Sequence, residues 1–175
     1  MSVDSNIDQS QWSWLQDTYW YVPPENLPAL QFDPDDDTLD WLIDQTVWHI
    51  SAFQSGYFWG SSATATLPAG GKSSQASVKP VCFNMLGSIT PEGRVYITFM
   101  LSRASSSRSA TTGIGRAVPH NNKWSLEMQM ATGSGKTTAH WAYMTQVKPG
   151  DSSWRVCPAL EFQCRKCFRD VSRQN

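Results

Sequence analysis

Residues 124–147 read WSLEMQMATGSGKTTAHWAYMTQV, and this stretch decides the fold class. Apolar and polar residues alternate over 124–130, and a second alternation runs over 140–145. A period of two places neighbouring side chains on opposite faces of a strand, so one face of each segment is expected to be buried. The glycine-rich residues 133–136 between the segments are typical of a turn. The stretch therefore predicts two antiparallel strands joined as a hairpin.

The same stretch contains a fragment of a nucleotide-binding motif. A phosphate-binding loop needs G-x-x-x-x-G-K-[ST] between a strand and a helix, and Gly135 and Lys136 match only its end. Met130 stands at the position of the first glycine, and the residues after the turn are β-branched and aromatic, which favours a strand. Gly113 and Gly115 are likewise only part of a dinucleotide fingerprint. The sequence therefore predicts no nucleotide site and no cofactor.

Further strands are expected at residues 18–22, 45–51, 56–60, 63–67, 81–89, 94–101 and 111–118. Short, turn-rich links between them indicate an antiparallel meander instead of βαβ crossovers. Residues 35–37 are acidic and are expected to cap a brief helix running through Leu42. Because open sheet edges are a liability that closure removes, we predict a mainly β fold, an up-and-down antiparallel barrel of about eight strands.

The two ends of the chain are expected to differ from the barrel. Residues 1–11 are polar and are predicted to be a disordered N-terminus, while residues 12–175 are predicted to form a single domain. After Pro158, apolar residues fall at mostly helical spacings. This pattern predicts a C-terminal amphipathic helix packed on the sheet.

Composition limits the classes of partner. The formal net charge of -1 offers no electrostatic case for nucleic acid. No apolar segment is long enough to span a membrane, and no secretory signal is visible, so we expect a cytoplasmic protein without membrane contact. The four cysteines are then expected to be reduced. Cys164 and Cys167 form a C-x-x-C, for which redox or zinc chemistry is the alternative to simple apolar packing; we predict no metal site.

Residues 18–22 read TYWYV, and Trp20 and Tyr21 resemble the G-x-W-Y first-strand motif of the lipocalins, with Thr18 in place of the glycine. A barrel followed by a helix is also similar to the lipocalins and, more broadly, to the calycins. The resemblance implies a cavity for a small apolar ligand.

Aromatic residues on the expected strands are the candidates for ligand binding. The set comprises Trp20, Trp48, Tyr57, Trp59 and Trp141. These rings either pack a solid core or line a pocket that stacks on a flat or polycyclic ligand. Under the second interpretation the protein is a binding module for a small apolar or aromatic molecule. A homodimer is left open.

Four side chains are the candidates for acid–base chemistry: Glu127, His140, His49 and Tyr143. If they face the same cavity, the alternative function is a cofactor-independent isomerase, cyclase or lyase. Which face of the 124–147 hairpin points inwards decides whether Glu127 or the apolar residues beside it reach that cavity. A third alternative is an interaction domain with a solid core.

Overall fold

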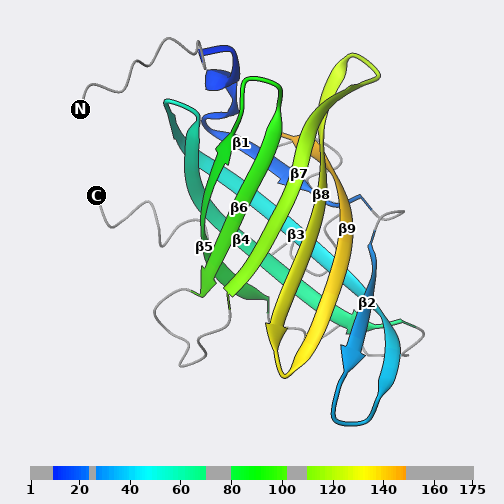
Figure 1. Cartoon of the computed structure of the whole chain (residues 1–175). Helices are drawn as coiled ribbons and strands as arrows, with labels where there is room; N and C mark the ends of the chain where they lie inside the picture. The colour runs from blue at the N-terminus through cyan, green and yellow to red at the C-terminus, as the bar shows by residue number, and fades with distance from the viewer. Residues whose placement is uncertain (1–9, 24–26, 70–79, 102–109, 149–175) are drawn as a thin grey trace.

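The computed structural model of the 175-residue chain describes residues 10–23, 27–69, 80–101 and 110–148, which form a closed antiparallel β-barrel (Figure 1). A short 3-10 helix, η1 (Ser10–Leu15), precedes the strands. The strands are β1 (Thr18–Tyr21), β2 (Pro28–Asp33), β3 (Thr38–Gln54), β4 (Tyr57–Pro68), β5 (Val81–Ile89), β6 (Arg94–Leu101), β7 (Ala110–His120), β8 (Lys123–Ser134) and β9 (Lys136–Val147).

Closure of the sheet depends on two sets of pairings. The strands from β3 to β9 pair with their neighbours in chain order, and β1 and β2 bridge β9 back to β3. Because β1 and β2 occupy one position in succession, the nine strands fill eight positions. The predicted antiparallel barrel of about eight strands is confirmed.

The position shared by β1 and β2 is interrupted. On the β3 side the interruption is bridged: Val22 N donates to Thr46 O at 3.1 Å and Asp44 N donates to Leu27 O at 2.8 Å. On the β9 side, pairing with β2 stops at Ala139, and pairing with β1 resumes only at Thr145. The barrel wall is therefore discontinuous beside β9 residues 140–144.

Alternate residues of each strand point inwards, and over most of the length of the barrel these inward residues are apolar. Trp20, Trp48 and Phe58 are among the largest fully buried side chains. Gly87 lies opposite Phe58 on the neighbouring strand, and a Cβ at this position would come within 2.3 Å of the Phe58 ring. The absence of a side chain at Gly87 thus makes room for the ring.

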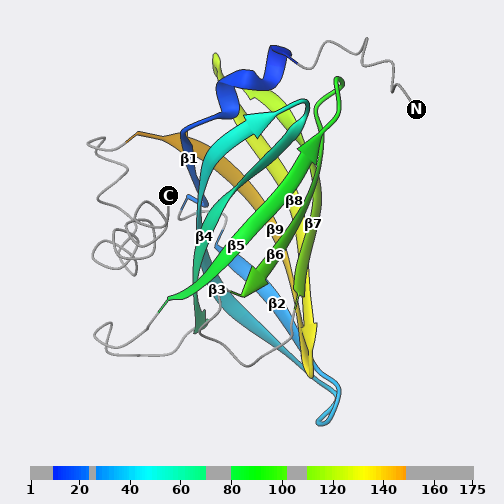
Figure 2. The ribbon, with the colours of Figure 1, turned by 90° about the vertical axis from the view of Figure 1, so that its left-hand side faces the viewer.

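One end of the barrel is closed by η1, which lies across it in Figure 2. The Trp14 ring stacks on Trp124 with centroids 5.8 Å apart, and Trp12 meets the same ring edge-on at 5.2 Å. Gln11 Nε2 donates to Pro91 O in the β5–β6 turn. These contacts leave the opposite end as the one where the interior can open.

The predicted hairpin of residues 124–147 is confirmed as β8 and β9. Its tip is Gly135, whose φ of 82° lies in the left-handed region that glycine tolerates best. Met128 and Met130 point inwards, and Glu127 points outwards. The glycine turn therefore joins two antiparallel strands and does not lead from a strand into a helix, as a phosphate-binding loop would.

The predicted helix after residues 35–37 is wrong. These acids form the turn between β2 and β3, in which Asp35 N donates to Asp33 Oδ1 at 3.1 Å and Asp37 has a φ of 51°. Aspartates favour such turns for the same reason that they favour helix caps, namely their short hydrogen-bonding side chains. Leu39 and Trp41 lie on β3 with exposed fractions of 63% and 62%, so no buried helix face exists there.

The expectations about the two ends of the chain are tested only in part. Residues 10 and 11, assigned to the disordered N-terminus, begin η1; residues 1–9 and the predicted C-terminal helix lie outside the described residues.

Cys82 is disulfide-bonded, so the expectation that every cysteine is reduced is wrong. The other three cysteines lie outside the described ranges. Within those ranges no helix has the length and apolar character needed to cross a membrane.

Trp20 and Trp48 form a matched pair for testing the core. Trp20 Nε1 donates to Thr18 Oγ1 at 2.9 Å, whereas Trp48 Nε1 has no hydrogen-bond partner in the described part of the chain. Both Trp→Phe substitutions remove similar volume, but only Trp20→Phe also removes a hydrogen bond. We expect Trp20→Phe to lower the free energy of unfolding by about 1 kcal/mol more than Trp48→Phe. Urea unfolding measures the difference; equal losses would contradict it.

Candidate functional site

A cavity of about 120 Å³ lies inside the barrel at the end opposite η1. Its lining residues are Asp44, Thr46, Ser62, Thr64, Thr66, Phe83, Phe99, Thr111, Met130, Thr132, Thr138 and His140. An apolar protein cavity of about 150 Å³ is large enough to hold benzene. At about 120 Å³ this cavity is somewhat smaller, so it suits a group no larger than a single small ring.

The lining has a polar and an apolar part. Seven of the lining residues carry hydroxyl groups: Thr46, Ser62, Thr64, Thr66, Thr111, Thr132 and Thr138. Phe83 and Phe99 contribute apolar surface and meet edge to face, with ring centroids 6.4 Å apart. Polar groups on one part of a cavity lining can orient a small ligand by hydrogen bonds, while the apolar part buries the hydrocarbon portion of the ligand.

The titratable groups among the described lining residues are Asp44 from β3 and His140 from β9. His140 Nδ1 lies 3.3 Å from Asp44 Oδ2, with side-chain exposed fractions of 2% and 15%. Asp44 Oδ1 also accepts hydrogen bonds from Thr64 Oγ1 at 2.9 Å and from Thr46 Oγ1 at 3.2 Å. These two hydroxyls also lie within hydrogen-bonding distance of each other, so their two protons satisfy two of these three contacts at a time. The carboxylate is therefore held in one orientation beside the imidazole.

The local fold explains how these two side chains meet. β3 and β9 flank the position shared by β1 and β2, and both Asp44 and His140 fall at its interruption. Gln45, next to Asp44, donates from Nε2 to Val22 O at 2.9 Å and so secures the end of β1. The Asp44–His140 pair thus spans the discontinuity of the wall from the inside.

An ion pair between β2 and β9 lies nearer the open end. Lys136 Nζ is 2.6 Å from Asp33 Oδ2, and Gln31 Nε2 donates to Thr138 Oγ1 at 3.1 Å, so both contacts tie β2 to β9. The hydrogen bond from Lys136 is the main cause that lowers the pKa of Asp33, and it outweighs the opposing effect of burial. The same contact raises the pKa of Lys136.

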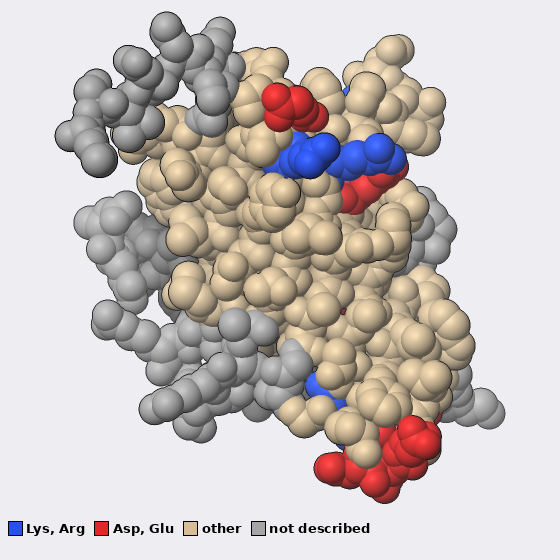
Figure 3. Space-filling model, viewed as in Figure 1, with Lys and Arg blue, Asp and Glu red and all other residues tan. Residues whose placement is uncertain are grey.

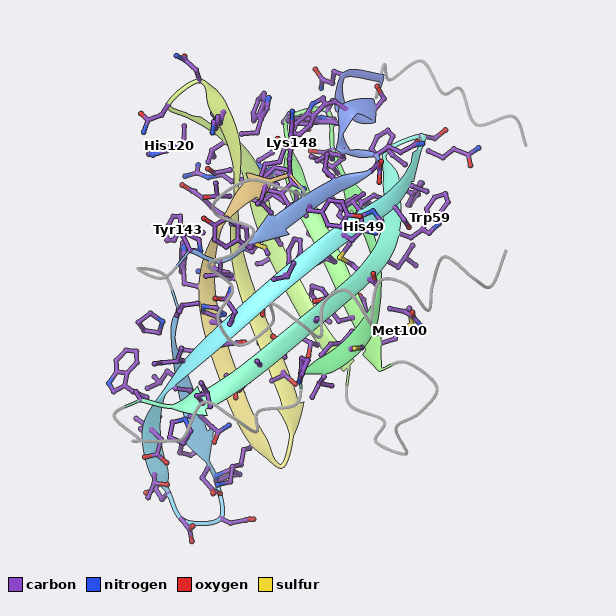
Figure 4. The ribbon with its side chains drawn as sticks, turned by 180° about the vertical axis from the view of Figure 1, so that it is seen from behind. His49, Trp59, Met100, His120, Tyr143 and Lys148 are labelled. Atoms are coloured by element: carbon purple, nitrogen blue, oxygen red, sulfur yellow. The ribbon has the colours of Figure 1, made fainter. Side chains whose placement is uncertain are left out.

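The structure disperses the four residues predicted for acid–base chemistry. His140 lines the cavity, whereas His49 and Tyr143 lie on the outside of the barrel (Figure 4). Glu127 also lies outside and pairs with Arg116 Nε at 2.8 Å. His49 Nε2 is 3.1 Å from Asp17 Oδ1, and its ring stacks on Tyr19 at 4.2 Å. Partial burial, and then the charge of Asp17, raise the pKa of Tyr19.

The predicted ligand-binding aromatics are divided in the same way. Trp20 and Trp48 are fully buried in the core, and Trp48 lies directly opposite the cavity residue Ser62 in the β3–β4 register. Tyr57, Trp59 and Trp141 are exposed on the outer face. The structure therefore brings none of these five rings into the cavity lining.

Exposed apolar side chains instead mark the outside of β4 to β9. One cross-strand row runs Tyr57, Ser88, Tyr96, Ile114, Gln129 and Trp141. The row contains no charged residue. On the face shown in Figure 3, charged side chains gather towards the two ends, and the broad middle is uncharged.

Sequence reasoning missed Asp44 and the hydroxyl-bearing residues. Asp44 follows the acidic residues 33–40 in the sequence and resembles them, although it shares its strand face with Thr46 and Trp48. In β4 the alternation of hydroxyl-bearing residues with Ala63 and Ala65 is a second signal of an inward polar row. Both signals follow the period of two that located the other strands.

Comparison with protein-family models, curated proteins and solved structures finds no match to this chain. The described residues contain no group of three or more histidine, cysteine or acidic side chains arranged to hold a metal ion. The fold and the site define a closed antiparallel β-barrel with a partly polar cavity at one end. This architecture is compatible with a calycin-like fold.

The Asp33–Lys136 pair predicts how stability depends on pH. Because the folded-state pKa of Asp33 is lowered, its contribution is present above the unfolded pKa of about 4 and is lost as the pH falls through the folded value. We expect Lys136→Met to lower the melting temperature near neutral pH and to lose less stability than wild type on acidification. The control is Lys123→Met at the opposite end, which should follow the wild-type pH profile. Parallel profiles for wild type and Lys136→Met would contradict the assignment.

Glu127 provides a test of the inside–outside assignment. Its pair with Arg116 is on the outer face, where removing such a contact costs less than about 1 kcal/mol. We expect Glu127→Gln to leave the backbone amide shifts of the cavity residues unchanged in NMR spectra. His140→Gln should shift them, because it replaces a lining group. Widespread shifts at the cavity in Glu127→Gln would place Glu127 inside the barrel.

Proposed function

We propose that this protein binds a small molecule in the cavity at the open end of the barrel. The observation that carries the proposal is a cavity that combines hydroxyl groups and an oriented Asp44–His140 pair with the Phe83 and Phe99 rings. The volume of about 120 Å³ favours a compact, single-ring molecule over the polycyclic ligand expected from the sequence. The ligand would place its ring against the phenylalanines and its polar group towards Asp44.

The packing of the interior supports this assignment. Towards η1 the core is filled by large side chains such as Trp20, Trp48 and Phe58. Among the described residues, hydroxyl-bearing side chains gather at the opposite end. Threonine and serine at inward positions give up apolar burial, which a purely structural core would favour. A binding role explains why this end remains polar.

The test uses two threonines that are neighbours on β7 and differ only in the face they occupy. Thr111 lines the cavity, while Thr112 is exposed. We expect benzyl alcohol and phenol to shift the NMR signals of cavity residues in wild type and in Thr112→Phe. Thr111→Phe fills the cavity and should abolish these shifts. The proposal fails if no single-ring compound shifts the cavity signals of wild type, or if Thr111→Phe binds as wild type does.

A cofactor-independent enzyme is the second candidate function. The observation that favours it is that a buried histidine–carboxylate pair faces the cavity, an arrangement suited to general acid–base chemistry. In this version His140 exchanges the proton and Asp44 orients it, while Glu127, His49 and Tyr143 lie too far outside to share the ligand. Incubating bound compounds and following them by NMR distinguishes the two functions. Chemical conversion that is lost in His140→Gln supports the enzyme.

For the location, we propose a compartment that permits disulfide bonds, in place of the cytoplasm expected from the sequence. Cys82 is disulfide-bonded, and such bonds persist in oxidising environments. Peptide mapping of the protein from its native source, after blocking free thiols, tests this proposal. An alkylated Cys82 would restore the cytoplasmic expectation.

The homodimer left open by the sequence would use the uncharged outer face. Tyr96 and Ile114 are exposed at its centre, and uncharged apolar patches commonly mark protein interfaces. Sedimentation of wild type and of Tyr96→Lys measures the oligomeric state. A monomeric wild type would exclude the dimer.

A further inference from the structure

The charges that surround the open end are unevenly distributed among the described residues. The β2–β3 hairpin carries five acids there: Asp33, Asp35, Asp36, Asp37 and Asp40. On the adjacent tip of β8 and β9, Lys136 is already engaged by Asp33. Asp36 and Asp40 also act on Lys136 electrostatically and raise its pKa. The described part of this end is therefore net negative.

Among the described residues that line the cavity, Asp44 is the one carboxylate, and none is a lysine or arginine. Its Oδ1 lies within hydrogen-bonding distance of the Thr46 and Thr64 hydroxyls, and its Oδ2 lies 3.3 Å from His140 Nδ1. An ionised carboxylate offers about four acceptor positions, so these contacts leave room for one further donor. The hydroxyl contacts hold the carboxylate in a fixed direction, so the entropy of orienting it is not lost when a ligand binds.

The rest of the lining sets the shape of a matching ligand. Phe83, Phe99 and Met130 provide apolar and aromatic surface in the same cavity. A protonated amine donates up to three hydrogen bonds, which suits a site rich in hydroxyl and carboxylate oxygens. A charge taken out of water needs a partner of opposite sign, and Asp44 supplies it.

We propose that the cavity binds a primary organic amine with a single small ring, whose ammonium group donates to the carboxylate of Asp44. The proposal rests on the small-molecule binding proposed above and adds the charge of the ligand. His140 and the two threonines position Asp44, while the phenylalanines contact the ring.

Three compounds of similar size and different charge test the proposal: benzylamine, benzyl alcohol and benzoate. Their affinities are measured near neutral pH by NMR titration of the full chain. We expect benzylamine to bind at least tenfold more tightly than benzyl alcohol and benzoate to bind least. Asp44→Asn keeps the side-chain shape and removes the charge, so benzylamine should fall to the affinity of benzyl alcohol.

Two further variants show whether a changed preference for benzylamine is due to Asp44, to the acids of the β2–β3 hairpin at the open end, or to a loss of folding. Thr64→Val removes one hydroxyl donor but retains the carboxylate, so it should still prefer benzylamine. Asp40→Asn removes an acid of the hairpin and should change the preference less than twofold. If Asp40→Asn abolishes the preference and Asp44→Asn retains it, the cation is recognised by the hairpin acids at the open end, and the assignment to Asp44 is wrong.

The results for wild type test separately whether the cavity binds small molecules and whether its ligand is a cation. If benzyl alcohol or benzoate binds at least as tightly as benzylamine, the charge of the ligand is wrong, while the small-molecule site stands. If none of the three compounds shifts the cavity signals, the small-molecule site itself is wrong for ligands of this class. A preference for benzylamine that depends on Asp44 supports both.

Discussion

Closure of the sheet on itself is the constraint on which the other features depend. Outside the interruption beside β9 residues 140–144, each strand has neighbours on both sides, with β3 meeting β4 on one side and the shared β1 and β2 position on the other. Once the barrel is closed, successive side chains of a strand point alternately into a narrow interior and to the outer surface. The position of every residue discussed above, including the separation of His140 from Glu127, follows from this division.

The narrow interior also explains the distribution of side-chain size. Trp20, Trp48 and Phe58 occupy the middle and the closed end, and small residues such as Gly87 and Ala142 lie among them. A closed ring of fixed size cannot accept large rings at every inward position. Trp141 and Tyr143 are accordingly on the outside, where their rings stack with centroids 6.2 Å apart. The partly polar cavity occupies the end where threonines take the place of the tryptophans, with Phe83 and Phe99 on its wall.

The regular second half of the barrel could be predicted from the sequence, but the site could not. β5 and β6 have the predicted bounds, because short turns separate segments of strong strand preference. On β9 both alternating sets contain apolar residues, so periodicity alone did not show which set faces inwards. Asp44 follows an acidic run of similar composition, and only the pairing of β3 with its neighbours separates it from the turn. The Asp44–His140 pair joins residues far apart in the chain, and no local sequence pattern predicts such a contact.

The interruption between β1 and β2 also has a consequence for how the chain can be divided. The segment from η1 to Val22 attaches through its own backbone pairings with β3 and β9, and through the buried side chains of Trp12, Leu15 and Trp20. Its contacts are complete without those of β2, which holds the barrel through a separate set. The segment is therefore a natural unit for fragment complementation, in which a peptide restores a barrel that lacks it. Because its tryptophans become buried on docking, the reunited protein would report its own assembly through fluorescence.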